Sequence, residues 1–200
     1  KYGNEALAVL AKIKYPKMLA QQYSDIAGVY LLKGDSEKSK SYYLKGIALR
    51  ATLKDTLGIA KIKANLSSLY TQNHMYDSAM VYGIEAMRIF EKKGHTQLAY
   101  IIKSNIATLY EYIQAYDKAL EYHYEVLEYY QKKNDKSFLA NLYNNIGKTL
   151  TNKGDTLKSI KAYKKSYQLA KESNNPKACS ATAFLLPSGE LITWMPFSLA

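Results

Sequence analysis

Residues 105–110, Asn-Ile-Ala-Thr-Leu-Tyr, and residues 116–120, Tyr-Asp-Lys-Ala-Leu, decide the fold, because related segments recur along the chain at intervals of 40 residues. Residues 65–70 and 145–150 repeat the first segment as Asn-Leu-Ser-Ser-Leu-Tyr and Asn-Ile-Gly-Lys-Thr-Leu, and residues 25–30 supply a more distant copy, Asp-Ile-Ala-Gly-Val-Tyr. A fixed period of this length indicates an array of repeats, in which each unit packs on its neighbours, rather than a domain with one central core.

Apolar residues within each copy recur at spacings of three and four, which is typical of a helix with one buried face. In the first copy Leu19, Tyr23, Ile26 and Tyr30 follow this pattern. Connectors of two or three residues make consecutive helices antiparallel, so each copy should be a helical hairpin. The sequence predicts helices at about 16–33 and 36–53, 56–73 and 76–93, 96–113 and 116–133, and 136–152 and 155–173.

Small residues occupy one position in the first helix of every copy and one position in the second. These residues are Ala27, Ser67, Ala107 and Gly147 in the first helices, and Ser39, Ala79, Ala119 and Ser159 in the second. Small side chains at both positions let paired helices approach closely, while larger neighbours fill the grooves beside them.

This pattern resembles the tetratricopeptide repeat: an apolar residue precedes a small one, an aromatic residue follows three positions later, a Gly-Asp-like turn comes next, and the second helix has a small central residue. The resemblance implies an all-α fold, a right-handed solenoid of tetratricopeptide-type antiparallel helical hairpins. The four repeats would span about 16–55, 56–95, 96–135 and 136–175. The usual unit has about 34 residues. The longer period resembles repeat modules of bacterial signalling regulators.

The two ends of the chain depart from the array. Residues 1–15 are interpreted as the end of a preceding repeat helix. Residues 176–200 form an atypical apolar tail, in which Glu190 is the only charged residue after Lys177 and Pro187 would break a helix. The tail could be a cap on the open end of the array, a short helix followed by an extended segment, or foreign sequence. Its prolines, glycine and glutamate disfavour a membrane span.

The sequence contains no motif that predicts an enzyme, a cofactor or a metal site. Its ten glycines are dispersed and form no phosphate-binding loop, and its three histidines do not stand at metal-ligand spacing. His123 shares the repeat position of Tyr43 and is expected to be a packing residue. Glu121 and Glu125 could do acid–base chemistry if buried, but their surroundings favour an exposed helix face.

The single cysteine excludes an internal disulfide, and the chain begins at Lys1, so a targeting segment is expected to have been removed. The cytoplasm and the bacterial cell envelope are both compatible with the sequence. The net charge of +11 can attract nucleic acid, anionic membranes or acidic proteins. The lysines are interleaved with acidic residues, which favours a solvated surface. Nucleic-acid binding, which would be strongly salt-dependent, and self-association through the array ends remain alternatives to protein binding.

The tetratricopeptide resemblance also implies that the first helix of each hairpin lines a concave surface. By register this surface includes Gln21, Ser24, Gly28 and Leu31 in the first copy, Lys61 and Ala64 in the second, Ile101 in the third and Thr151 in the fourth. The predicted partner-binding residues are Asn65, Ser68, Thr71, Ser104, Asn105, Thr108, Glu111, Asn141, Asn144, Asn145 and Lys148.

The expected partner is a protein or peptide, and the chain is expected to be a scaffold, as the sensor or interaction module of a larger regulator. Some family members clamp a terminal carboxylate with lysine and asparagine. Here the clamp lysine is replaced by Ser24, Ala64, Ser104 and Asn144 in the four copies. The recurring Asn65, Asn105 and Asn145 could bond either the backbone of a partner or a neighbouring helix.

Overall fold

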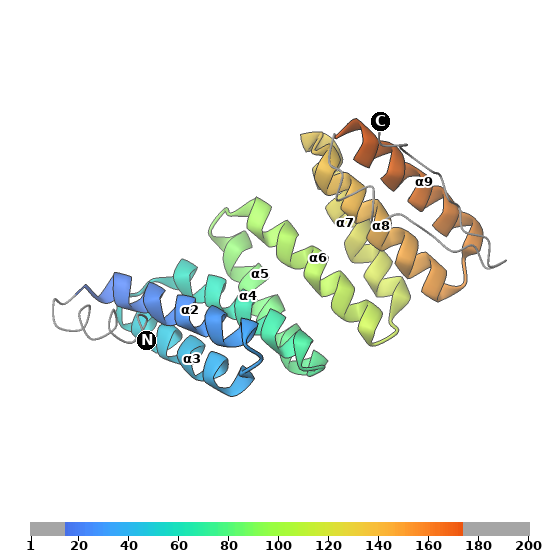
Figure 1. Ribbon diagram of the computed structural model, residues 1–200. Helices are drawn as coiled ribbons and strands as arrows, with labels where there is room; N and C mark the ends of the chain where they lie inside the picture. Colours follow the sequence, from blue (N-terminus) through green and yellow to red (C-terminus); the bar gives the residue numbers. More distant parts are fainter. Residues whose placement is uncertain (1–14, 174–200) are drawn as a thin grey trace, which may run out of the picture. The chain divides into compact units, whose positions relative to one another are not determined.

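The computed structural model describes residues 15–173, which form eight α-helices and no strand (Figure 1). The helices are α2 (Pro16–Leu32), α3 (Ser36–Thr52), α4 (Thr56–Gln72), α5 (Tyr76–Lys92), α6 (Thr96–Tyr112), α7 (Tyr116–Lys133), α8 (Lys136–Lys153) and α9 (Thr156–Glu172). They agree with the predicted helices to within one residue at each end, and the all-α repeat fold is confirmed. The predictions for residues 1–14 and 176–200 lie outside the described residues.

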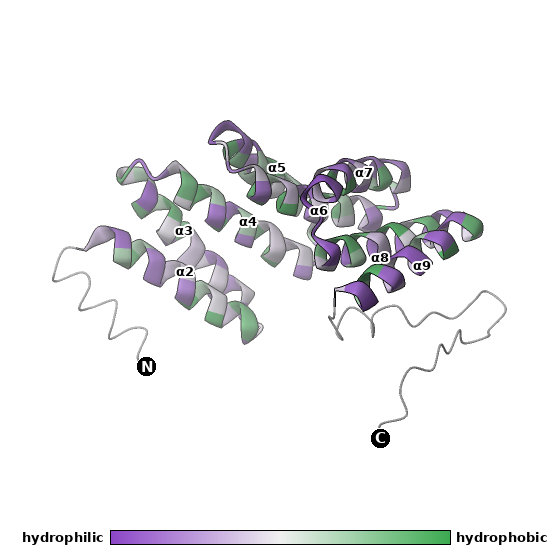
Figure 2. Ribbon diagram, turned by 90° about the horizontal axis from the view of Figure 1, so that it is seen from above, coloured by the Kyte–Doolittle hydropathy of each residue, from purple (hydrophilic) through white to green (hydrophobic). Residues whose placement is uncertain are grey.

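The helices belong to two compact units, which are described separately. The N-terminal unit has α2 to α6, and within it α2 packs on α3, α3 on α4, α4 on α5, and α5 on α6. The C-terminal unit has α7 to α9, and within it α7 packs on α8 and α8 on α9. Hydrophilic and hydrophobic stretches alternate along the helices (Figure 2), as expected for helices that bury one face.

Every described connector contains one residue with a left-handed backbone, and these residues are spaced exactly 20 apart. Three of them are glycines, Gly34, Gly94 and Gly154, with φ of 76°, 73° and 91°. The other four are Lys54, His74, Gln114 and Asn134, with φ between 53° and 60°. The left-handed residue ends one helix and turns the chain into the next, so the same turn separates all eight helices.

Aspartates begin half of the described helices. Asp35, Asp55, Asp135 and Asp155 each accept a hydrogen bond from the backbone N–H three residues later, which satisfies one of the free donors of the first turn. In these four helices the cap therefore follows directly after the left-handed residue of the connector, and the two together set the helix start.

The predicted small residues lie buried between helices. Ser67 Oγ donates to the Ala79 carbonyl at 2.7 Å, which joins the small positions of α4 and α5. A Cβ on Gly46 of α3 would come within 2.9 Å of Cδ1 of Ile62 on α4, so this glycine allows close packing between successive repeats. His123 is fully buried, in agreement with its predicted packing role.

Candidate functional site

A solvent-accessible cavity of about 340 Å³ in the N-terminal unit is lined mainly by residues of α2, α4 and α6. Six of the residues that line it were placed on the concave surface or at its edge by the sequence register: Gln21, Ser24, Lys61, Ala64, Asn65 and Ile101. The first helices of three successive repeats therefore contribute to one cavity. Of the residues predicted to bind a partner, Asn65 is the one that lines it.

The apolar part of the cavity has a buried floor and a half-buried edge. Ile62, Phe90 and Ile102 are buried and form the floor, and Leu98 is half-buried beside Ile101. Phe90 comes from α5, a second helix, and Leu98 lies in the first turn of α6; neither residue was predicted to lie at the binding surface. Aliphatic and aromatic side chains exposed to a cavity favour an apolar group from a ligand, because its burial removes apolar surface from water.

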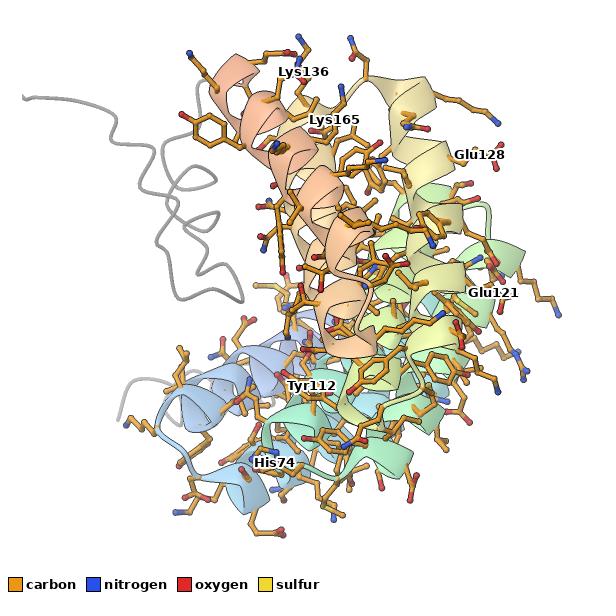
Figure 3. All side chains as sticks on the ribbon, turned by 90° about the vertical axis from the view of Figure 1, so that its right-hand side faces the viewer. His74, Tyr112, Glu121, Glu128, Lys136 and Lys165 are labelled. Carbon is orange, nitrogen blue, oxygen red and sulfur yellow. The ribbon has the colours of Figure 1, made fainter. Side chains whose placement is uncertain are left out.

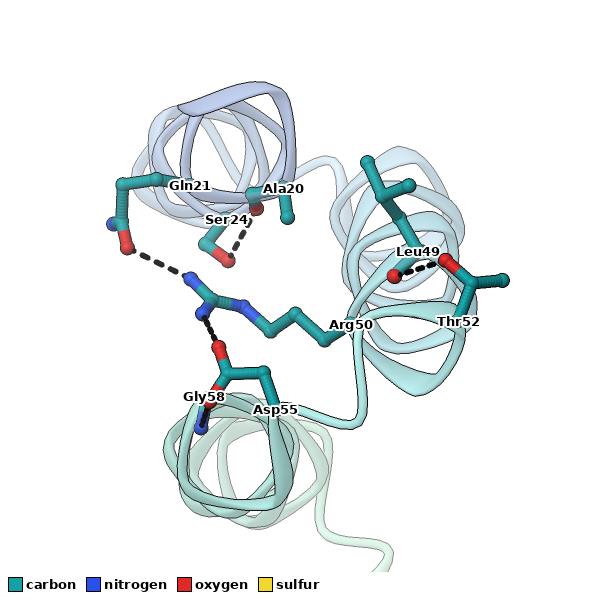
Figure 4. Close-up of polar contacts among 8 residues, drawn as sticks. All are labelled: Ala20, Gln21, Ser24, Leu49, Arg50, Thr52, Asp55 and Gly58. Carbon is teal, nitrogen blue, oxygen red and sulfur yellow. Dashed lines mark hydrogen bonds and ion pairs between the residues drawn. The ribbon is translucent and has the colours of Figure 1, made fainter. Parts of the chain in front are cut away.

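Arg50 supplies a cation to the cavity from α3, also a second helix. Figure 4 shows its side chain extending between α2 and the start of α4. Nη2 donates to Oε1 of Gln21 at 2.9 Å and Nη1 donates to Oδ2 of Asp55 at 2.5 Å, while Nε is shielded from solvent and has no hydrogen-bond acceptor. The side chain is 12% exposed, so Arg50 is a largely buried charge held by two polar partners.

Asp55 balances Arg50 and begins α4. Its Oδ1 accepts from the Gly58 N–H at 2.8 Å, and this bond, followed by the contact with Arg50, lowers the pKa of Asp55 although partial burial opposes the shift. A Cβ on Gly58 would overlap both the guanidinium and the carboxylate, so a larger residue here would displace the Arg50–Asp55 contact from its present geometry. The ion pair therefore depends on a glycine in the first turn of α4.

Lys61 is the second cation of the cavity, and it is exposed at the rim. The neighbouring Lys63 forms an ion pair with Glu85 of α5 at 2.7 Å and does not line the cavity. Among the described residues that line the cavity there are two cations, Arg50 and Lys61, and no carboxylate. The cavity thus combines an apolar floor with a positively charged, hydrogen-bonding edge.

Asn65 and Asn105 present free amides on this face. Both side chains are exposed, and neither makes a hydrogen bond to another described residue. Within the described residues, neither asparagine makes the bond to a neighbouring helix that the sequence left as an alternative. Their donors and acceptors are available to a partner without the loss of an internal bond.

The hydroxyl groups of this face are bonded to their own helices. Ser24, Ser68, Thr71 and Thr108 each donate to the carbonyl four residues earlier, at distances between 2.8 and 3.3 Å. Such bonds occupy the hydroxyl donor and leave the oxygen as an acceptor. The principal side-chain donors for a ligand on this face are therefore Lys61, Asn65 and Asn105.

Comparison with known proteins identifies the repeat. A family model of the tetratricopeptide repeat matches residues 98–172, a second tetratricopeptide repeat model matches residues 20–52, and together they cover more than half of the chain. The chain belongs to the tetratricopeptide-repeat family. Repeats of this family typically bind proteins or peptides as scaffolds, and their fold is generally not catalytic. No match was found among curated proteins.

Solved structures of other tetratricopeptide-like arrays have the same fold. BtubC from P. vanneervenii aligns with a TM-score of 0.78 at 22% identity, over 86% of this chain and 72% of that protein. Aspartyl phosphate phosphatase F from Bacillus subtilis aligns with a TM-score of 0.81 at 15% identity, over 91% of this chain and 48% of the phosphatase.

A signal transduction ATPase with numerous domains from Pyrococcus horikoshii, which has a tetratricopeptide repeat sensor, aligns with a TM-score of 0.79 at 15% identity. The alignment covers 90% of this chain and 28% of the ATPase. The chain therefore spans about half or less of two of these proteins, and at such identities the similarity describes the tetratricopeptide fold alone.

The remaining predicted residues of the tetratricopeptide array differ in exposure. In the N-terminal unit Ser104 is half-buried and Glu111 is buried, with 7% of its surface exposed. Glu111 was expected on the accessible concave surface, but its side chain is buried. In the C-terminal unit Asn141 and Lys148 are exposed, while Asn144 and Asn145 are half-buried. Oδ1 of Asn144 is shielded from solvent and accepts no hydrogen bond.

The carboxylates of α7 lie on an open face. Glu121 and Glu125 are both exposed, and Figure 3 shows Glu121 and Glu128 projecting outward from α7. Across residues 15–173 there is no group of three His, Cys, Asp or Glu residues that could hold a metal ion. Within the same range no helix is both long and apolar enough to cross a membrane.

The tyrosines of the array stack on one another. Tyr30 stacks on Tyr42 with ring centroids 5.6 Å apart, and Tyr70 stacks on Tyr82 at 5.4 Å. Nζ of Lys45 lies 4.8 Å from the centroid of Tyr42. These rings use their faces for packing inside the hairpins, and such faces are what a single-stranded nucleic acid would need for base stacking.

Proposed function

We propose that the face formed by α2, α4 and α6 binds a segment of a partner protein, and that the array is the sensor or interaction module of a larger regulator. The observation that carries the proposal is the cavity to which the first helices of three successive repeats contribute. A preformed surface of this kind needs little ordering on binding, which favours affinity. The segment would occupy the cavity and bond the exposed amides of Asn65 and Asn105.

The chemistry of the cavity supports a protein segment more than a metabolite or a reaction. Its floor is apolar and it opens to solvent along a helical face, as in grooves that receive peptide side chains. The hydroxyls near it are bonded to backbone carbonyls, and no described His, Cys or acidic side chain lines it. The described lining therefore offers contacts to a ligand but no carboxylate, imidazole or thiol for metal binding or acid–base chemistry.

The experiment compares two arginine substitutions in the full chain. Ala64→Arg places a large side chain inside the cavity, and Ala48→Arg places the same side chain on the exposed outer surface of α3. Both variants and the unaltered chain are used to capture proteins and nucleic acids from extracts of the source cells, with washes at low and at high salt. The proposal predicts a protein that the unaltered chain and Ala48→Arg retain at high salt and that Ala64→Arg loses.

Two outcomes would count against the proposal. If Ala64→Arg retains the same protein, the face formed by α2, α4 and α6 is not the surface that binds it. Capture of nucleic acid alone, released by the high-salt wash, would favour the alternative in which the net charge of +11 drives binding to phosphates.

A further inference from the structure

We propose that the cavity recognises an acidic side chain and a large apolar side chain that lie close together within an internal segment of the partner. This inference rests on the proposed function, because it names the chemistry of the segment that the same cavity would bind. It follows from the charge of the lining residues, from their free hydrogen-bond donors, and from the apolar floor.

The charge of the cavity matches one carboxylate. Arg50 and Lys61 line it, and Arg50 is balanced by Asp55, which lies 2.5 Å from Nη1 behind the lining. Of the two cations among the described lining residues, Arg50 is therefore neutralised and Lys61 leaves one positive charge. One positive charge complements the single negative charge of Asp or Glu, whereas a phosphate group carries nearly two negative charges at neutral pH.

The free donors lie at the same edge. Lys61 and Asn65 are exposed side chains one helical turn apart on α4, and the side-chain N–H groups of both can point to one ligand oxygen pair. The guanidinium of Arg50 already donates to Gln21 and Asp55, and its Nε is shielded from solvent, so the donors available to a ligand here are those of Lys61 and Asn65. A carboxylate accepts hydrogen bonds only, so it fits an edge at which donors predominate.

The apolar contact is provided by α5 and α6. Phe90 of α5 is buried, and Leu98 and Ile101 of α6 are half-buried in the same lining. A Leu, Ile, Met or Phe side chain would cover these groups. Because the charged edge and the apolar edge belong to one cavity of about 340 Å³, the acidic and apolar residues of the partner should be within a few positions of each other.

The segment is internal rather than a chain terminus. Clamping a terminal carboxylate would need lysine where this chain has Ser24, Ala64 and Ser104. Beyond the cavity the same face continues with the short side chains of Ser68 and Thr108, which leave room for the partner's backbone to run on.

The test uses a display library of short random peptides, from which the peptides that bind are selected. A carrier protein follows each peptide in the chain, so no peptide ends in a free terminal carboxylate. The targets are the full unaltered chain, Lys61→Glu, Lys92→Glu and Ala64→Arg. Lys92→Glu is the matched control, since Lys92 is exposed on α5 and does not line the cavity. Thermal melting confirms that each variant is folded.

The proposal predicts that the unaltered chain and Lys92→Glu enrich peptides with Asp or Glu near Leu, Ile, Met or Phe. Lys61→Glu should lose this preference and bind the best acidic peptide about tenfold more weakly, a change typical for the loss of one favourable charge contact and its replacement by a like charge. Changing the peptide's Glu to Gln should weaken binding to the unaltered chain and have little further effect on Lys61→Glu.

The remaining outcomes separate this inference from the proposed function. Three outcomes would overturn the acidic-apolar specificity: enriched peptides without acidic residues, the same preference in Lys61→Glu, or no enrichment on the unaltered chain. None of them would change the result of the protein-capture experiment. Selected peptides that bind Ala64→Arg as tightly as the unaltered chain would contradict the placement of the binding site itself.

Discussion

Nη1 of Arg50 donates to Oδ2 of Asp55 across 2.5 Å, and this contact ties the last turn of α3 to the first turn of α4. Asp55 also accepts from the Gly58 N–H, so one carboxylate caps a helix and neutralises a largely buried cation. The same guanidinium lines the cavity on the face of α2, α4 and α6. The Arg50–Asp55 pair therefore contributes both to the stability of the array and to the chemistry of the cavity.

Asp55→Ala should destabilise the array by about 2 kcal/mol or more, because it removes a helix cap and leaves Arg50 without its anionic partner. Asp155→Ala is the matched control, since Asp155 caps α9 in the same way but pairs with the exposed Lys158. Chemical denaturation of both variants gives the comparison. An equal loss of unfolding free energy in the two variants would show that the Arg50 contact contributes nothing beyond the cap.

The capping aspartates should make the array sensitive to acid. The pKa values of Asp35 and Asp155 are lowered first by the hydrogen bonds from Lys38 and Lys158, and that of Asp55 first by the Gly58 N–H. Each folded carboxyl therefore releases its proton at lower pH than the unfolded one. Their contribution to stability is complete above the ordinary carboxyl pKa of about 4 and disappears as the pH falls through the lower folded values.

Melting temperatures measured between about pH 7 and about pH 3 test this expectation. A chain with Asn at positions 35, 55 and 155 keeps cap acceptors but has no carboxyl to titrate there. Its melting temperature should decline less steeply below about pH 4 than that of the unaltered chain. Parallel declines would indicate that other groups govern the acid response.

Two glycines within first helices should respond oppositely to alanine. A Cβ at Gly147 would overlap the ring of Tyr163, so Gly147→Ala should cost about 1–3 kcal/mol by overpacking. A Cβ at Gly28 has no neighbouring atom within 4 Å, so Gly28→Ala should stabilise α2 by about 0.5–1 kcal/mol through reduced backbone freedom in the unfolded chain. A Gly147→Ala variant that is not destabilised would contradict the close approach of Gly147 to Tyr163, and a destabilised Gly28→Ala variant would contradict the open space at Gly28.

The double variant Asn65→Ala with Asn105→Ala should keep the stability of the array and weaken binding of its partner. Both amides are exposed and make no internal hydrogen bond, so their removal should change the unfolding free energy by less than about 0.5 kcal/mol. Affinity is measured for the protein captured by the unaltered chain. Unaltered affinity would exclude these amides from the interface, while a large loss of stability would show an internal role.

The fold was predictable because the 40-residue period places the same residue types at the same structural positions. The left-handed residues from Gly34 to Gly154 stand 20 apart, so helix ends follow from the period even where the residue is Lys54 or His74. His123 was correctly expected to pack because Tyr43 shares its repeat position. The role of a residue in one copy could thus be predicted from the residues at the same position in the other copies.

The cavity was only partly predictable, because two of its important residues belong to second helices. The register of the first helices indicated Lys61 and Ala64, but Arg50 reaches the cavity from α3 by the length of its side chain. A signal was present: in the other three copies the position of Arg50 holds the buried residues Phe90, Tyr130 and Ala170. A charged residue among buried equivalents marks a place where the repeat departs from simple packing.

Site-specific photo-crosslinking tests most directly whether the face of α2, α4 and α6 is the binding surface. A photoreactive amino acid replaces Asn65 at the cavity or Ala48 on the outer surface of α3, in the full chain mixed with the captured partner. The account predicts a covalent adduct from position 65 that disappears when Ala64→Arg is added, and no adduct from position 48. An adduct from position 48 without one from position 65 would contradict it.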